Sequence, residues 1–383
     1  MRITIVQGAF LPVPPLLGGA VEKVWFTLGK EFARRGHEVT HVSRSFIDLP
    51  RREMIDGVAH RRISGFASPA TTSRRLLLDF WYALRARSQL PPADILVTNS
   101  FWLPALELRR SRGRAYVHVA RYPKGQLRLY RRAILQTVSE PIRQAILAEL
   151  PGATNRVRVI AYPLAERYLR PEPGGASHTM LYTGRIHPEK GVHLLVQAFA
   201  HLSPADRASW KLQIVGPSEI AFGGGGDAYL AKLRNTAASL GGSVEFVGRV
   251  FDETRLIEHY NNASIFVYPS LAERGETFGL AVLEAMAAGC APLVSDLACF
   301  RDFIRPEVNG QIFDHRSSDP VGTLVAALAS MVRDRESTAR IRHAAWLTAR
   351  EYTLSKIASQ FLADFAQLSG KAPYPGNPAA GSA

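Results

Sequence analysis

Short apolar runs alternate with amphipathic stretches along almost the whole chain. Runs rich in β-branched and aromatic residues predict strands, and apolar positions three or four residues apart predict helices. In the first half, strands are expected at 2–8, 38–44, 57–66, 94–100, 115–120, 136–139 and 156–162, with the clearest helix at 19–35. In the second half, strands are expected at 179–185, 211–216, 244–248, 264–270 and 291–295, and helices near 191–202, 227–240, 252–261, 277–288 and 319–333.

This repeated order predicts an α/β protein of two doubly wound, Rossmann-like domains facing each other across a cleft. A chain of 383 residues is long enough for each domain to bury its own core. We expect a first domain at 1–165, a linker rich in Pro and Gly at 166–178, and a second domain at 179–355. A helix at 356–370 is expected to pack back on the first domain, and the composition of 371–383 is typical of a disordered tail.

Basic residues are concentrated in the first half of the chain. Residues 1–172 hold 28 lysines and arginines against 13 acidic residues, whereas residues 173–383 hold 19 against 20. The net charge of +14 therefore comes from the first half. This asymmetry indicates an anionic partner for that half, which could be a membrane surface, a phosphorylated substrate or a nucleic acid.

The apolar runs are shorter than the ~18 residues that would indicate a transmembrane helix. The segment 1–15 is interrupted by prolines and lacks the continuous apolar stretch of a signal peptide. We therefore expect a cytoplasmic protein that could lie peripherally on the inner face of a membrane. The two cysteines, Cys290 and Cys299, are too few for a disulfide framework and are expected to be packing thiols.

Ligands of open α/β sheets bind outside the carboxyl ends of the strands, so the polar residues expected there are of interest. One group is GRIHPEKG, residues 184–191, which contains Arg185 and Lys190. These two cations suit a diphosphate, because Arg donates as a fork and Lys acts as a point charge. The alternative is a solvated loop that carries two surface cations.

A second group is ETFGLAVLE, residues 276–284, with Glu276 and Glu284 at its ends. The helix expected to begin between Thr277 and Leu280 offers free N–H groups and a positive dipole end. Glu276 would repel a phosphate placed there, so a neutral polyol suits it better, and Glu284 could accept hydrogen bonds from a ribose diol. Alternatively, Glu276 only complements the helix dipole and Glu284 forms a salt bridge.

Two further groups lie in the first half. Gly18 and Gly19 would let the backbone approach a phosphate, or they form only the entry turn of the helix 19–35. His118, followed by Arg121 and Lys124, is either a catalytic group near the end of a strand or a satisfied core histidine.

Some sequence features exclude other sites. The glycines match neither the dinucleotide-binding motif nor the P-loop, and the tetraglycine at 223–226 is expected to be a flexible loop. The chain has no D-x-D, no H-E-x-x-H and no Cys–His cluster, so no metal site is expected.

Three motifs in combination resemble the family 4 retaining glycosyltransferases, which have the GT-B fold. They are GGAVEKVWFTLGKEFARRGHEV near the start, GRIHPEKG, and ETFGLAVLEAMAAG about ninety residues later. The similarity covers about residues 1–370 and implies that the first domain binds an acceptor and the second a nucleotide sugar.

The resemblance also implies residue roles. Arg185 and Lys190 match the cations on the donor diphosphate, Glu276 the acid on the transferred sugar, and Glu284 the acid on the ribose. The other positions that match the donor site are Gly18, Gly19, His118, Val250, Thr277, Phe278, Gly279 and Leu280. Of these, His118 matches a histidine near the reacting face of the sugar, and Val250 lies where the base is usually held.

The expected activity is therefore transfer of a hexose from a nucleotide-diphosphate sugar to a hydroxyl of a glycan, glycolipid or small molecule, with retention and without a metal or other cofactor. UDP-sugars are favoured, and GDP-mannose is next. Two alternatives are a nucleotide-sugar epimerase of the same fold and a basic nucleic-acid-binding protein. The second lacks any recognised nucleic-acid motif, so no nucleic-acid partner is expected.

The segment 73–87 predicts an amphipathic basic helix. On a helical wheel Leu76, Leu77, Phe80 and Leu84 share one face and Arg74, Arg75 and Arg85 lie on the other, which is typical of a helix at a membrane interface. The alternative is that the leucines pack on the sheet and the arginines are solvated. Arg74, Arg75, Arg121 and Lys124 are the expected contacts with a membrane or an acceptor.

Overall fold

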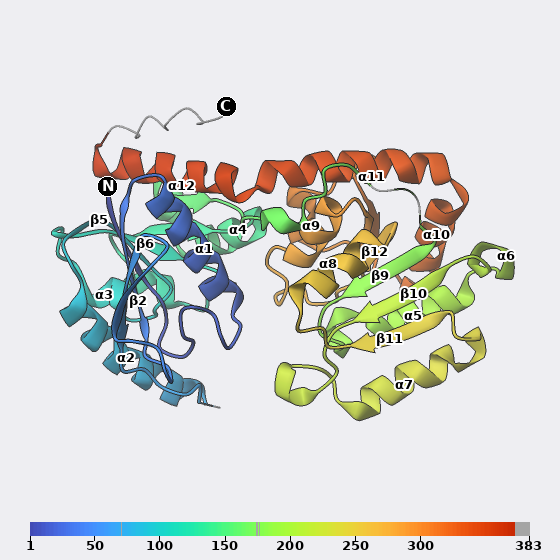
Figure 1. Cartoon of the computed structure of the whole chain (residues 1–383), viewed down its shortest axis with the longest axis horizontal. Coiled ribbons are helices and arrows are strands. Elements are labelled where there is room, and N and C mark those ends of the chain that lie inside the picture. Colours follow the sequence, from blue (N-terminus) through green and yellow to red (C-terminus); the bar gives the residue numbers. More distant parts are fainter. Residues whose placement is uncertain (70, 174, 176, 372–383) are drawn as a thin grey trace. The chain divides into compact units, whose positions relative to one another are not determined.

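The chain divides into two compact units (Figure 1). The computed structural model describes residues 1–69, 71–173, 175 and 177–371. Unit 1 is formed by Met1–Pro163 together with the chain from Leu354 onward, and unit 2 by Leu164–Thr353. The expected linker 166–178 thus begins inside unit 2, because Tyr168 is buried there against Tyr260. The expected tail, beyond residue 371, lies outside the described residues.

Unit 1 contains a sheet in the order β3-β4-β2-β1-β5-β6-β7-β8, in which only β3 pairs antiparallel with its neighbour. Its strands are β1 Arg2–Val6, β2 Glu38–Arg44, β3 Arg52–Ile55, β4 Val58–Ile63, β5 Ala93–Thr98, β6 Arg112–His118, β7 Ile134–Thr137 and β8 Val157–Val159. Its helices are α1 Ala20–Arg34, α2 Thr72–Gln89, α3 Leu103–Leu106, α4 Glu140–Glu149 and α12 Leu354–Ser369. The 3-10 turns are η1 Gln126–Leu129 and η2 Pro151–Arg156.

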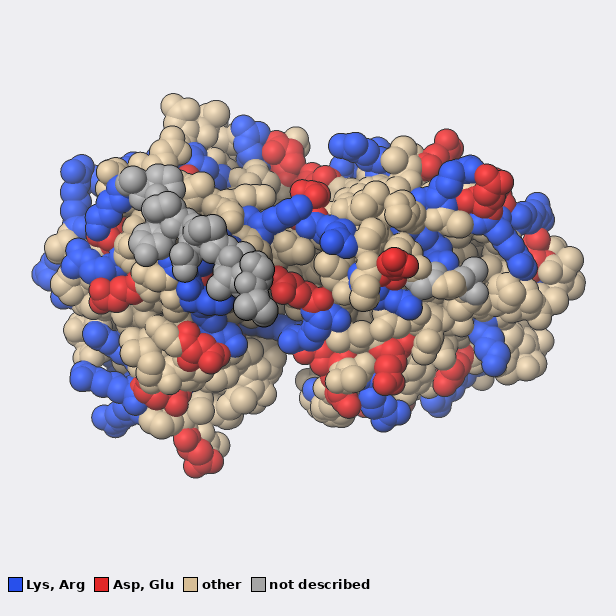
Figure 2. Space-filling model, turned by 45° about the horizontal axis from the view of Figure 1, so that its top comes forward, with Lys and Arg blue, Asp and Glu red and all other residues tan. Residues whose placement is uncertain are grey.

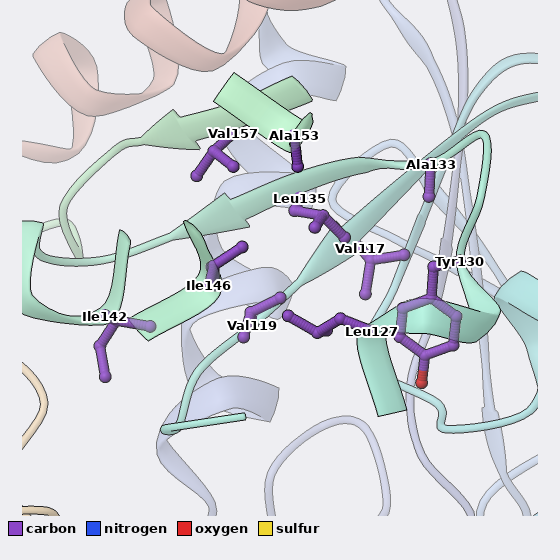
Figure 3. Close-up of a cluster of buried hydrophobic side chains, with 10 residues drawn as sticks. All are labelled: Val117, Val119, Leu127, Tyr130, Ala133, Leu135, Ile142, Ile146, Ala153 and Val157. Carbon is purple, nitrogen blue, oxygen red and sulfur yellow. The ribbon is translucent and has the colours of Figure 1, made fainter. Parts of the chain in front are cut away.

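Alternation along the strands sends neighbouring side chains to opposite faces of this sheet. Val117 of β6 and Val119, just after this strand, join a buried cluster with Leu135 of β7 and Ile142 and Ile146 of α4, which Figure 3 shows. Tyr116 and His118, between and beside them, point to the other face, where α1 and α12 lie. Each sheet face thus has its own helical cover.

The last helix, α12, is a structural part of unit 1. Phe361 lies 5.1 Å from Trp25, and Phe365 lies 5.0 Å from Tyr116, measured between ring centroids. Asp364 accepts hydrogen bonds of 2.8 Å from the Tyr116 hydroxyl and from Nε of Arg158. The aromatic contacts bury apolar surface, and the Asp364 carboxylate ties the helix to β6 and β8.

Unit 2 contains a parallel sheet in the order β11-β10-β9-β12-β13-β14, the arrangement of a doubly wound fold. Its strands are β9 Thr179–Thr183, β10 Lys211–Val215, β11 Val244–Gly248, β12 Ile265–Tyr268, β13 Ala291–Ser295 and β14 Gln311–Phe313. Its helices are α5 Val192–His201, α6 Pro204–Arg207, α7 Asp227–Ala237, α8 Glu253–Asn261, α9 Leu280–Ala287, α10 Pro320–Arg333 and α11 Arg335–Ala349. The 3-10 turns are η3 Glu166–Tyr168, η4 Pro188–Lys190, η5 Ile220–Phe222, η6 Ala238–Leu240, η7 Ala298–Asp302 and η8 Arg350–Tyr352.

The hydrophobic pattern does not predict β3, β14 or α11. The two strands are edge strands of four and three residues, too short to carry a clear alternation. The helix α11 buries Thr338 and Arg342 together with its apolar residues, which weakens the helical period. In the described residues no helix is both long and apolar enough to cross a membrane, and both cysteines are buried and unpaired.

A pair of buried histidines in unit 1 makes its stability dependent on pH. His41 and His60 are paired across β2 and β4, with ring centroids 5.3 Å apart. Burial lowers the pKa of His60 from 6.5 to about 4 and holds the pKa of His41 well below its usual value. Between about pH 6.5 and pH 4, His60 binds a proton in the unfolded chain but not in the folded chain. The stability of the folded state therefore decreases as the pH falls through this range.

We therefore expect His60→Leu to reduce the loss of unfolding free energy between pH 7 and pH 5 by about 2 kcal/mol. Urea denaturation at the two pH values measures this difference. The exposed His201→Leu variant is the matched control and should show the wild-type pH dependence. An unchanged pH dependence in His60→Leu would show that this histidine is protonated equally in the folded and unfolded chains.

Candidate functional site

The strand order of unit 2 reverses between β9 and β12, which pair directly. Loops from adjacent strands leave in opposite directions at such a point and open a crevice for a ligand. The loop 184–191 follows β9, and the loop 269–279 follows β12. Arg185 and Lys190 lie in the first loop and Glu276 in the second, so the topology gathers three of the expected site residues.

Close backbone approach holds the loop 184–191 in place. A Cβ atom at Gly191 would overlap the carbonyl oxygen of Pro269, and one at Gly216 would overlap the carbonyl oxygen of Gly184. Both positions have φ in the left-handed region, at 66° and 148°. Leu271 N–H also donates to Glu189 O at 2.8 Å. The ends of β9, β10 and β12 can therefore meet only with glycine at these positions.

Lys190 and Glu276 bind each other. Nζ of Lys190 lies 2.8 Å from Oε2 of Glu276, and the Tyr268 hydroxyl donates to the same oxygen at 3.0 Å. The two side chains are only 9% and 12% exposed, so the pair is largely desolvated. The predicted phosphate cation and the predicted sugar-binding acid thus form an ion pair with each other.

Arg185 is held from two sides. Its guanidinium donates to Glu189 Oε1 at 2.5 Å and to Gly223 O at 2.9 Å. Arg185 is also 42% exposed at its side chain, so it could exchange these partners for an anion. The guanidinium is oriented before any ligand binds, which lowers the cost of ordering it.

The tetraglycine at 223–226 differs from the expected flexible loop. Gly224 N–H donates to Glu219 O, Gly225 N–H to Ile186 O, and Gly226 N–H to Ser218 O, at 2.7 to 2.9 Å. The bond from Gly225 joins the segment to the loop 184–191, and the other two join it to residues 218–219. The run of glycines predicts a flexible loop. In the structure, the lack of side chains instead allows the backbone of Gly223 to lie close to Arg185.

Glu284 lies apart from Glu276, in α9. The Tyr260 hydroxyl donates to Glu284 Oε2 at 3.2 Å, and Thr183 Oγ1 lies 2.5 Å from that hydroxyl. Thr183 ends β9, so this chain of hydrogen bonds also reaches the carboxyl edge of the sheet. Glu273, the other acid of this segment, is instead paired with Arg316 at 2.8 Å. The structure therefore has Glu276, and not Glu273, beside Lys190.

The helix α9 begins at Leu280, with Gly279 at its N-cap, which lies within the range from Thr277 to Leu280 that the sequence predicts. Thr277 and Phe278 form the turn before it. The Phe278 ring is buried against Phe303, at 5.4 Å between ring centroids. The buried ring therefore continues the apolar pattern of the helix into the turn.

Val250 follows β11 and is half-buried. The sequence did not indicate the cluster beside it, in which the Arg249 guanidinium lies 3.5 Å from the Phe222 ring centroid and 4.0 Å from that of Phe251. Phe251 is 78% exposed. Flat, exposed surfaces of this kind favour stacking with a planar ring. A Gly-Arg-Val-Phe run directly after a strand is the signal that could have indicated it.

In unit 1, Gly18 and Gly19 form the entry to α1. A Cβ at Gly19 would overlap the Glu22 carboxylate. Glu22 is buried, which raises its pKa, while Arg121 acts in the opposite direction. Sequence analysis did not single out Glu22, although an acid three residues after a helix-capping position is a recognisable signal.

Arginines from two strand ends anchor the loop that leads to Gly18. Nη1 of Arg44 donates to Phe10 O at 2.8 Å, and Nη2 of Arg62 donates to Val13 O at 3.1 Å. The Arg62 side chain is fully buried and also pairs with Glu53. Some of the arginines of unit 1 therefore stabilise loops of the same unit.

His118 ends β6 and is buried. Its Nδ1 lies 2.6 Å from Gln136 Oε1, and its Nε2 lies 3.3 Å from the Tyr162 hydroxyl. The Trp25 ring packs against it in a T-shaped arrangement, with 5.6 Å between ring centroids. Burial lowers the pKa of His118 to about 4, so the ring is neutral near pH 7. Arg121 and Lys124, which follow it, are exposed.

The expected apolar face of α2 is wrong in part. The helix buries Asp79, Tyr82, Ala83 and Ala86, whereas Leu77 is 58% exposed. Leu76, Phe80 and Leu84 are half-buried. The buried face of the helix is therefore rotated from the predicted leucine face toward Asp79. Asp79 explains this rotation, because its carboxylate accepts hydrogen bonds from Ser100 Oγ and from two backbone N–H groups of the loop after β5.

The arginines of α2 divide into two groups. Arg75 donates to Ser68 Oγ and Pro69 O, and Arg85 donates to Ser64 O, so both hold the preceding loop. Arg74 is exposed, beside the exposed Leu77 and Trp81. Among the described residues no three His, Cys, Asp or Glu side chains gather as a metal site.

Two family models match the chain. The model described as glycosyl transferases group 1 matches residues 172–346, and the model described as glycosyltransferase family 4 matches residues 18–164. The matches fall on unit 2 and unit 1 respectively, and they include the loops described above.

Curated relatives share about half of their length with this chain. A phosphatidyl-myo-inositol mannosyltransferase of Mycolicibacterium smegmatis is 30% identical over 224 residues, which are 58% of this chain and 52% of that protein. A lipopolysaccharide 1,2-N-acetylglucosaminetransferase of Salmonella typhimurium is 29% identical over 183 residues, which are 48% of this chain and 46% of that protein.

Solved structures match nearly the whole chain. A sucrose-phosphate synthase from Thermosynechococcus elongatus has a TM-score of 0.78 at 18% identity, with 97% of this chain and 99% of that chain covered. HepE of Anabaena in complex with UDP has a TM-score of 0.70 at 17% identity, with 96% and 100% covered. At these identities the likeness concerns the fold. The two family models, which together match most of the chain, show that it belongs to the family 4 glycosyltransferases, and the solved structures show that it has the GT-B fold.

Proposed function

We propose that this protein transfers a hexose from a nucleotide-diphosphate sugar to a hydroxyl of a glycan, glycolipid or small-molecule acceptor. The observation that carries the proposal is the convergence of Arg185, Lys190 and Glu276 at the point where the strand order of unit 2 reverses. Two cations suit the diphosphate of such a donor, and a carboxylate can accept hydrogen bonds from the hydroxyls of its sugar. UDP is the favoured nucleotide, since solved structures of this fold are described as complexes with UDP and UDP-glucose, and GDP-mannose is the next candidate.

The Lys190–Glu276 ion pair suggests how the donor binds. A diphosphate would offer Lys190 a stronger partner than one carboxylate, and Glu276, once released, would accept hydrogen bonds from the sugar hydroxyls. Neither charge is then left buried without a partner, a situation that would cost several kcal/mol. The exchange would keep the crevice electrostatically balanced in both the empty and the bound state.

Catalysis would come from the same cations. As the bond from the anomeric carbon to the phosphate oxygen breaks, negative charge grows on the leaving diphosphate, and Arg185 and Lys190 stabilise it more in the transition state than in the ground state. The acceptor oxygen bonds to the anomeric carbon on the same face, and its proton passes to the leaving phosphate. This course preserves the anomeric configuration and requires no metal. An epimerase would instead change the sugar without an acceptor.

Arg185→Ala and Lys190→Ala should each lower turnover by roughly a hundredfold, because each removes a preorganised charge from the developing phosphate dianion. Sugar transfer from UDP-glucose and GDP-mannose to a panel of acceptors measures the effect, with folding checked by circular dichroism. Arg340→Ala, which removes an exposed ion-paired arginine of the same unit, is the matched control and should keep full activity. Near-normal transfer by both site variants would rule out the phosphate assignment.

The same assay in excess EDTA tests metal independence. Transfer should persist, since the fixed cations would neutralise the diphosphate. Loss of activity that magnesium or manganese restores would overturn this part of the proposal.

Glu276→Ala should weaken binding of the nucleotide sugar but not of the free nucleotide diphosphate, whereas Glu284→Gln should weaken both, because both ligands contain the ribose. Calorimetry with UDP and UDP-glucose measures the contrast. Glu273→Ala is the control, since Glu273 is paired with Arg316. Equal losses for both ligands in both variants would contradict the two roles.

We also propose that unit 1 binds an anionic membrane or a polyanionic acceptor. The surplus of 15 positive charges in residues 1–172 and the exposed Arg74, Leu77 and Trp81 of α2 support this. In the view of Figure 2 the cations lie among acidic and neutral side chains and form no single continuous patch. The attraction would therefore be distributed, at ~1 kcal/mol for each cation near an anionic surface.

Cosedimentation with vesicles of anionic lipid, and not with neutral vesicles, is the expected outcome, and it should weaken as salt rises. A double variant, Leu77→Ser with Trp81→Ser, should reduce the bound fraction, whereas Leu347→Ser, at an exposed leucine of unit 2, should not. Protein that stays in the supernatant with anionic vesicles at low salt would refute membrane binding.

A further inference from the structure

The side-chain amide of Gln136 has only one orientation that satisfies its surroundings. Its Nε2 lies 2.7 Å from Thr137 O and 2.7 Å from Ile160 O. Backbone carbonyls only accept hydrogen bonds, so the nitrogen must face them and the oxygen must face away. That oxygen, Oε1, lies 2.6 Å from Nδ1 of His118, the residue opposite Gln136 on β6.

This arrangement determines the tautomer of His118. An amide oxygen has no proton to give, so Nδ1 of the imidazole must be the donor in this hydrogen bond. In a neutral ring the second nitrogen, Nε2, then carries a lone pair. The Tyr162 hydroxyl, 3.3 Å from Nε2, is a donor of the kind that such a lone pair accepts.

The neutral state of the ring follows from its surroundings. His118, Gln136 and Tyr162 are all buried. Tyr162 is the titratable group in contact with the ring, and Glu22 and Arg121 act on Tyr162 with opposite signs. In the part of the chain that the structure describes, the two ring nitrogens are bonded to Gln136 and Tyr162, and neither partner is a carboxylate that would favour the imidazolium.

We propose that Gln136 is a positioning residue that holds His118 in the Nδ1–H tautomer, so that Nε2 is presented only as a hydrogen-bond acceptor for a hydroxyl. The role in catalysis rests on the proposed function, in which His118 lies near the reacting face of the sugar. The tautomer itself does not depend on that function. In this state His118 cannot act as an acid at Nε2, but it can orient a hydroxyl group.

A purely structural role is the competing explanation, since Gln136 also joins β7 to the carbonyl of Ile160. Two variants separate the roles. Both Gln136→Leu and Gln136→Glu lose the hydrogen bonds to Thr137 and Ile160, but only Gln136→Glu keeps an oxygen that can accept from His118. Effects shared by the two variants are structural, and effects confined to Gln136→Leu report the tautomer. Because a carboxylate at position 136 also favours the imidazolium, the variants are compared at a pH at which the Nε2 signal of Gln136→Glu is that of an unprotonated nitrogen.

The experiment is nitrogen NMR of the full chain labelled at histidine, with His118 assigned by the signals lost in His118→Gln. The wild type should show a protonated Nδ1 and an unprotonated Nε2 near neutral pH. Gln136→Glu and Tyr162→Phe should keep Nδ1 protonated, and Gln136→Leu should show a mixture of tautomers. A protonated Nε2 and bare Nδ1 in the wild type, or an unchanged tautomer in Gln136→Leu, would overturn the inference.

Activity supplies the second readout. Gln136→Leu should lower kcat roughly tenfold relative to Gln136→Glu, as expected for the loss of one oriented hydrogen bond. If the NMR result holds but Gln136→Leu transfers sugar as fast as Gln136→Glu, the positioning role in catalysis is wrong although the tautomer is correct. If the wild type transfers no sugar from any donor, the proposed function fails, while the NMR result still decides the tautomer.

Discussion

The donor half of the site depends on backbone segments that approach one another more closely than side chains would permit. Gly191 lies against Pro269, and Gly216 lies against Gly184, at the carboxyl ends of β9, β10 and β12. Any side chain at these positions would push the loops apart and separate Arg185 from Glu276. The lack of a side chain at these two glycines thus allows the backbone to position the polar groups of the crevice. The hydrogen bonds between those groups then refine an arrangement that the backbone determines.

Within that frame the charges are balanced in pairs. Lys190 is neutralised by Glu276 and Arg185 by Glu189, at distances of 2.8 and 2.5 Å. A crevice with unpaired cations would bind a diphosphate more tightly, but it would carry the desolvation cost while empty. The paired arrangement lowers that cost, and it makes affinity depend on how well a ligand replaces both partners of a pair. Such a site would discriminate against anions that lack hydroxyl groups.

Sequence alone predicted most of the elements and their order, and it placed Arg185 and Lys190 in a loop directly after a strand, where the structure also has them. These predictions of local structure agree with the structure because strand periodicity, glycine and charge are local properties. The features that the sequence did not predict depend on contacts between residues that are far apart in the chain. The face of α2 was predicted incorrectly because Asp79 bonds to residues 100–102, and the order of the tetraglycine was missed because its partners are at 186 and 218–219. The environment of His118 similarly requires Gln136 and Tyr162, which no spacing rule connects.

The discontinuity of unit 1 affects the order in which the protein can fold during synthesis. Phe361 and Phe365 of α12 fill the space beside Trp25 and Tyr116, yet they emerge from the ribosome after all of unit 2. Unit 2 is one uninterrupted segment and can complete its core as it emerges, whereas the first 163 residues must wait with an open apolar face. The part of this chain that is synthesised first is therefore the last to complete its core.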